Sequence, residues 1–167
     1  FRRVLFRSPL LMPSGSERSR HVVLVIDSTS SMGQQVGVST SFAQAKNRAS
    51  RLIGVLPQGT KVSVLTLGHQ PEMRLDRTSD LYEARELVEG LKITHGAAVL
   101  ADVLPMLAAR VEGREADETL EIYLFSDFQK TTVLGRSTEN ADAVSGFRAA
   151  CQHAPISLID VEIGRAH

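Results

Sequence analysis

Apolar residues along this chain gather in short clusters, separated by segments in which they recur at helical spacing. The clusters lie at residues 21–27, 62–67, 120–125 and 156–161, and the first, HVVLVID, contains a continuous apolar run. A short run that is apolar at successive positions is typical of a strand covered on both faces of a parallel sheet. We therefore predict four strands. Residues 21–26 should be central, residues 62–67 and 120–125 should flank them, and all three should be buried on both faces.

Helical periodicity fills the intervals between these clusters. It predicts helices over residues 41–56, 81–91, 99–107 and 141–151, the second capped by Ser79 or Asp80. Pro105 lies inside the third helix and should kink it or start a new one. Residues 71–75 form a predicted edge strand, and residues 28–37 a polar loop. Strands that alternate with helices imply a three-layer α/β sandwich, in which a Rossmann-like, mostly parallel sheet carries helices on both faces.

Composition excludes several classes of protein. The chain has 167 residues, enough for one domain with its own core. A single cysteine, Cys151, excludes an internal disulfide framework and a cysteine-cluster metal site. Lys and Arg together number 19, as do Asp and Glu, so the charge gives no indication of a nucleic-acid partner. No apolar run approaches the roughly 20 residues of a membrane helix.

The two ends of the chain differ from the rest. Residues 1–8 read FRRVLFRS and residues 163–167 read IGRAH, and both resemble in-frame translations of a short-read sequencing adapter. We interpret them as artefacts that form no part of the fold. Residues 9–20, rich in Pro, Ser and Gly, are expected to be a linker, which leaves residues 21–162 as the domain.

Polar residues follow two of the predicted strands at the edge where open parallel sheets bind ligands. Asp27, Thr29 and Ser31 alternate after the first strand, so one turn could direct all three oxygens to the same side. Asp127 follows residues 120–125, and Thr94 lies in the loop before the third helix. Hard oxygen ligands of this kind suit Mg²⁺. The sequence therefore predicts a cation site of Asp27, Thr29, Ser31 and Asp127, with Thr94 as a possible addition.

These residues resemble the motifs of the von Willebrand factor A domain. The segment VVLVIDSTSSM is similar to that family's first strand and its metal-ion-dependent adhesion site, Asp-x-Ser-x-Ser, matched here by Asp27, Thr29 and Ser31. LFSDF is similar to the later strand that supplies a second aspartate, here Asp127. The family also supplies a threonine after a glycine, where this chain has Ala97. The resemblance thus implies a Mg²⁺ or Mn²⁺ site whose affinity is weakened.

The resemblance also implies what the domain does. It is closest to the bacterial, membrane-anchored group of aerotolerance-related (Bat-type) proteins, where a Pro-containing basic linker joins a membrane helix to the first strand. The implied parent protein is anchored in the cell membrane by flanking helices absent from this piece, which is itself soluble and lacks the family's last helix and strand. The implied partner is another protein, bound through an acidic side chain at the metal.

Two other functions remain open at the sequence level. Because Ala97 replaces the loop threonine, the domain could be an interaction module that no longer binds metal. An enzyme such as a hydrolase is less favoured, because the chain lacks a dinucleotide fingerprint, a phosphate-binding loop and a nucleophile elbow.

Overall fold

The computed structural model describes residues 19–96, 99–127, 145 and 148–149, together with the backbone of residues 156–160. Within these residues a sheet of five strands runs in the order β5 (Pro71–Thr78), β4 (Lys61–Leu67), β1 (Arg20–Asp27), β6 (Thr119–Ser126) and β7 (Ile156–Asp160). β1 pairs in parallel with both β4 and β6, and β7 in parallel with β6, whereas β5 is antiparallel. The predicted central strand, its two neighbours and the edge strand are all confirmed.

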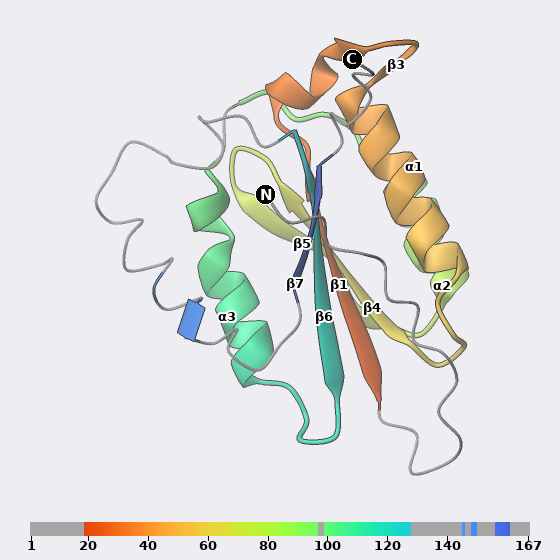
Figure 1. Ribbon diagram of the computed structural model, residues 1–167, viewed down its shortest axis with the longest axis vertical. Coiled ribbons are helices and arrows are strands. Elements are labelled where there is room, and N and C mark those ends of the chain that lie inside the picture. Colours follow the sequence, from red (N-terminus) through yellow and green to blue (C-terminus); the bar gives the residue numbers. More distant parts are fainter. Residues whose placement is uncertain (1–18, 97–98, 128–144, 146–147, 150–155, 161–167) are drawn as a thin grey trace.

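Helices cover both faces of the sheet, as Figure 1 shows. α1 (Ser41–Gly54) and α2 (Leu81–Gly90) lie side by side on one face, and α3 (Leu104–Glu112) lies on the other. Successive side chains of a strand point to opposite faces. Val22, Leu24 and Ile26 of β1 accordingly pack with the α1 and α2 layer, while Val23 and Val25 pack with α3. The predicted three-layer sandwich is confirmed.

Local chemistry sets where the helices begin. Thr40 accepts a hydrogen bond from the Ala43 amide through its side chain, which caps α1, and Asp80 caps α2. Pro105 lies in the first turn of α3, directly after the short 3₁₀ helix η2 (Leu100–Asp102). A proline is tolerated there because its missing N–H would have no partner within the helix. Of the two outcomes predicted for Pro105, a kink or the start of a new helix, the structure shows the second.

The structure corrects the sequence prediction at two places. Residues 28–37 are more ordered than a loop: they include the 3₁₀ helix η1 (Ser30–Gly33) and the strand β2 (Gln35–Val36), which forms a hairpin with β3 (Ser39–Thr40). The second correction concerns β6, where Glu121 and Tyr123 are only half-buried. Both belong to a polar cluster at that face, because Arg20 pairs with Glu121 through two hydrogen bonds and the Tyr123 hydroxyl donates to Glu121.

Several predictions concern residues that the structure does not describe. The helix predicted over residues 141–151 lies largely outside the described residues, as do both adapter-like ends and most of the predicted linker. Of the helices that are described, none has the length and apolar character needed to cross a bilayer.

Candidate functional site

The carboxyl ends of β1 and β6 bring two aspartates to one edge of the sheet. Asp27 is the last residue of β1 and is fully buried, and Asp127 directly follows β6 and is also buried. β1 and β6 are parallel neighbours, with Ile26 paired to Phe125, so the residues that follow emerge together. The structure thus places both predicted carboxylates at the edge where the sequence placed them.

The alternate residues that follow β1 turn their oxygens toward Asp27. Thr29 donates to Asp27 Oδ1 twice, from its hydroxyl at 2.7 Å and from its amide at 3.0 Å. The hydroxyl oxygens of Thr29 and Ser31 are 3.0 Å apart. Because the Thr29 hydrogen is directed at Asp27, Ser31 is the donor in that second contact. Three of the four predicted ligands are therefore linked, with Thr29 in contact with both Asp27 and Ser31.

Burial and a neighbouring charge both act on the Asp27 carboxyl. Burial raises the pKa of the Asp27 carboxyl above its usual range, and the negative charge of Asp127 adds to this effect. Hydrogen bonds from Ser126 and Thr29 act in the opposite direction. A carboxylate whose charge is disfavoured by burial and by a neighbouring aspartate is a natural location for a cation.

The donor set fits a hard divalent cation. Oxygens that are adjacent on an octahedron around Mg²⁺ lie about 2.9 Å apart, and the contacts of Thr29 with Asp27 and Ser31 measure 2.7 and 3.0 Å. Within the described part of the chain, no three His, Cys, Asp or Glu side chains gather as a metal site, so hydroxyl groups would have to complete the set. The residues present are compatible with Mg²⁺ or Mn²⁺ and offer no soft ligand.

Thr94 occupies a different position from the other four predicted residues. Its hydroxyl donates to the carbonyl oxygen of Ser28 at 3.1 Å and lies 3.2 Å from the Ser28 hydroxyl. Thr94 therefore contacts the backbone of Ser28, which lies between the predicted ligands Asp27 and Thr29. Ala97, where the family has its threonine, lies outside the described residues.

Sequence reasoning missed several residues that shape this edge. Ser126 donates to Asp27 Oδ2 at 2.6 Å and so fixes the carboxylate from the side opposite Thr29. The signal available in the sequence was its place as the residue before Asp127 at the end of an apolar run. Ser28 lies in the segment predicted to be a polar loop, yet it is fully buried and its hydroxyl donates to the carbonyl of Leu67.

A second polar cluster lies at the opposite end of the sheet. The Ser63 hydroxyl is 2.9 Å from His21 Nε2, and His21 Nδ1 is 3.8 Å from a carboxylate oxygen of Glu118. This arrangement resembles the nucleophile, base and acid of a hydrolase. Ser63, however, is fully buried, donates to Asp76 and accepts from the amide of Arg77. It has no access to a substrate, so the cluster provides no support for hydrolysis.

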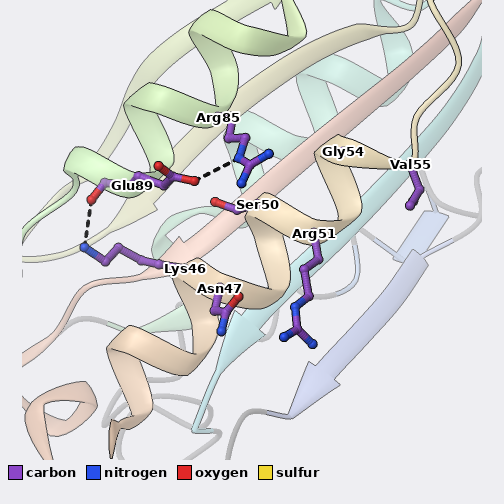
Figure 2. A pocket seen from close by; sticks show the side chains of 8 residues that line it. All are labelled: Lys46, Asn47, Ser50, Arg51, Gly54, Val55, Arg85 and Glu89. Atoms are coloured by element: carbon purple, nitrogen blue, oxygen red, sulfur yellow. Dashed lines mark hydrogen bonds and ion pairs between the residues drawn. The ribbon is translucent and has the colours of Figure 1, made fainter.

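A groove between α1 and α2 is the third feature with polar side chains (Figure 2). Lys46 donates from α1 to the carbonyl oxygens of Glu89 and Leu91 at the end of α2, which links the two helices. Arg85 pairs with Glu89 at 2.9 Å within α2 itself. The groove therefore serves the packing of the helix layer and is separate from the edge that carries Asp27.

Comparison with solved structures identifies the fold. BatB, a conserved hypothetical protein from Bacteroides thetaiotaomicron, is similar with a TM-score of 0.65 and 20% identity, over 83% of this chain and 64% of that one. An aerotolerance-related membrane protein from Bacteroides fragilis matches at a TM-score of 0.52 and 15% identity, over 85% and 92%. The vWF domain of the type V pili tip protein Mfa5 from Porphyromonas gingivalis matches at a TM-score of 0.50 and 22% identity, over 65% and 38%. The chain thus spans about two thirds of the BatB structure.

Comparison of the sequence gives the family. No curated protein sequence matches the chain. The model of the von Willebrand factor type A domain, in contrast, matches residues 22–129. This span begins within β1, ends just beyond Asp127 and covers more than half of the chain. The chain belongs to the von Willebrand factor type A domain family.

Proposed function

We propose that this domain is a cation-assisted protein-interaction module of a membrane-anchored bacterial protein. Domains of this family are typically interaction modules, which sets the general class. The specific proposal is a Mg²⁺ or Mn²⁺ ion held by Asp27, Thr29, Ser31 and Asp127. A carboxylate of the partner protein would complete the shell of the ion, and no catalysis is involved.

The contact of Asp27, Thr29 and Ser31 beside Asp127 is the observation that carries this proposal. The hydroxyl of Thr29 contacts the buried Asp27 carboxylate, and the hydroxyl of Ser31 lies beside it, so three oxygen-bearing side chains are gathered at one place. Burial also disfavours the charged form of Asp27, and a cation would compensate for that cost. Membrane anchoring is supported by the likeness to the aerotolerance-related membrane protein of Bacteroides fragilis.

Thermal unfolding with and without Mg²⁺ tests the metal. An ion that binds only the folded domain stabilises it by about 1.4 kcal/mol at ten times its Kd. For a domain of this size that corresponds to a rise of about 3–5 °C in Tm. Mn²⁺ should act similarly, and an EDTA-treated sample is the reference.

A metal-independent interaction domain is the second candidate, and Ala97 in place of the family's threonine favours it. A Tm that stays constant from EDTA to millimolar Mg²⁺ and Mn²⁺ would select this second function. A water molecule can replace the missing hydroxyl as a ligand of Mg²⁺, so we expect weakened binding in place of none.

A further inference from the structure

Residues 27–31 divide into two sets that alternate along the chain. Asp27, Thr29 and Ser31 bond one another, as described above. Ser28 and Ser30 bond the neighbouring segments of the chain, at Leu67 and at residues 94–96. The first set faces the candidate ion, and the second set connects the loop to the rest of the domain.

Both backbone polar groups of Ser28 are fixed. Its amide donates to the carbonyl of Leu67 at 2.8 Å. Its carbonyl accepts from the Thr94 amide at 2.8 Å and from the Thr94 hydroxyl at 3.1 Å. The peptide units on either side of Ser28 therefore cannot rotate without breaking these bonds. These units connect Asp27 to Thr29, so the bonds set the relative direction of the two ligand side chains.

Gly68 leaves the space that these contacts need. A Cβ atom built on Gly68 would lie 2.5 Å from the Thr94 hydroxyl oxygen and 3.2 Å from that of Ser28. Separations below 3.0 Å are essentially never seen for real Cβ atoms. Gly68 is thus required at this point because Thr94 approaches its backbone closely.

Ser30 makes a second, more exposed connection to the same segment. Its amide donates to the Gly96 carbonyl at 3.3 Å, and its hydroxyl accepts from the Gly96 amide at 3.2 Å. Thr94 thus contacts Ser28, and Gly96 contacts Ser30. The two connections hold the ligand loop at both of its non-ligand positions.

We propose that Ser28, Gly68 and Thr94 are positioning residues that hold Asp27, Thr29 and Ser31 in a shared orientation before any ion arrives. The effect on cation affinity rests on the proposed metal function, whereas the contacts that position the loop are present without metal. If the loop were free to rotate, only a fraction of molecules would present the ligands together, and the apparent affinity would fall by that fraction.

Substitution of Thr94 tests the proposal through cation affinity. Thr94→Val keeps the shape and removes the hydroxyl, whereas Thr94→Ser keeps the hydroxyl. Thr94 is itself exposed, so both variants are expected to fold. Calorimetric titration with Mn²⁺ should show binding about tenfold weaker for Thr94→Val and near wild type for Thr94→Ser. The matched control is Thr60→Val, a buried threonine just before β4 at the opposite end of the sheet, which should leave affinity unchanged.

Amide hydrogen exchange in EDTA provides a measurement that needs no ion. The amides of Ser28 and Ser30 should exchange faster in Thr94→Val, while those of residues 62–67 in β4 keep their wild-type rates. Gly68→Ala should have the same two effects, because its Cβ would displace the Thr94 hydroxyl although residue 94 itself is unchanged. It gives an independent second variant.

The outcomes separate the two proposals. Unchanged exchange and unchanged Mn²⁺ affinity in both Thr94→Val and Gly68→Ala would overturn the positioning proposal and leave the metal site standing. If the wild-type domain binds no cation and the two variants still exchange faster than it does, the metal function would be overturned and the positioning role supported. Equal loss of Mn²⁺ affinity in Thr94→Ser and Thr94→Val would also overturn the positioning proposal, because the Thr94 hydroxyl would then be irrelevant.

Discussion

The carboxylate of Asp27 accepts three hydrogen bonds in a place that water does not reach. Thr29 supplies two of them and Ser126 the third. Even so, burial and Asp127 leave the pKa of Asp27 raised, so its charge costs folding energy at neutral pH.

Asp27→Asn should raise the Tm of the metal-free domain, because the amide keeps an oxygen for Thr29 and removes the charge. The same change should abolish the rise in Tm on adding Mg²⁺. Melting curves in EDTA and in Mg²⁺ measure both effects. Asp80→Asn, far from the site in sequence and also a charge removal, is the control and should keep the Mg²⁺ response. A lower Tm for Asp27→Asn in EDTA would contradict the charge argument.

Ala97→Thr restores the residue type that the family resemblance expects at this position. An added hydroxyl ligand should replace a water on the ion and increase affinity, so the Mg²⁺-dependent rise in Tm should become larger. The comparison needs Ala97→Val, which adds similar bulk without a donor and should not increase the rise. An equal response of the two variants would show that position 97 does not reach the ion.

At the scale of single elements, the start of α2 depends on one side chain. Asp80 Oδ1 accepts from the amides of both Tyr82 and Glu83 at 3.0 Å. Asp80→Ala should lower the free energy of unfolding by about 1 kcal/mol, and Asp80→Asn should recover most of the loss. Chemical denaturation measures both. A smaller effect of Ala than of Asn would mean that the cap is unimportant here.

The cluster around His21 joins β1, β4 and β5 through buried polar contacts. Burial lowers the pKa of His21 to about 4, and the positive charges of Arg77, Arg110 and Lys61 add to this effect. The neutral imidazole donates to Ser63, whose own hydrogen is directed at Asp76. The fold therefore holds a histidine that is protonated far less readily than it is in the unfolded chain.

This difference predicts a loss of stability in acid. The unfolded chain binds a proton at His21 near pH 6.5, and the folded domain does so only near pH 4. Stability should therefore be complete above about pH 6.5 and decline toward pH 4, by up to about 3 kcal/mol. His21→Gln, which keeps a donor for Ser63, should have a flatter profile. Subtracting the stability profile of His21→Gln from that of the wild type removes the contributions of other titrating groups, such as Asp27. A difference that stays constant with pH would contradict the prediction.

Elements with strong local signals could be predicted from the sequence, and those built from long-range contacts could not. β1 contains the unbroken apolar run Val22–Ile26, and Pro105 marks the start of α3 by its missing N–H. The β2–β3 hairpin escaped prediction because two-residue strands have no periodicity. The half-buried state of Tyr123 also escaped, because it depends on Arg20 and Glu121 from two strands.

The same limit applies to the site. Asp27, Thr29 and Ser31 were predicted because alternate polar residues after a strand are visible in sequence. The roles of Ser28 and Gly68 were not, because they depend on contacts with Thr94, which lies 66 residues after Ser28 in the sequence. Close backbone approach leaves no trace in composition or spacing.

For the whole molecule, two apolar clusters on opposite faces of the sheet provide the core. Among the residues that the structure describes, both are built from residues 22–125. The ends resemble translated adapter sequence, so deleting residues 1–8 and 163–167 together should leave Tm within about 1 °C of the full chain. Differential scanning calorimetry of the two chains tests this. A fall of several degrees would show that the ends pack on the domain.

The alternation along residues 27–31 bears on how such a domain can change over generations. The side chains that would select an ion are not those that shape the loop, so the two properties can be inherited separately. A lineage could replace Asp27 or lose a ligand, as at Ala97, and still keep the same binding surface. A single later substitution could then restore the ion, because the loop would not have to be built again. Among distant relatives, a small residue at position 68 should therefore persist even where the aspartate has gone.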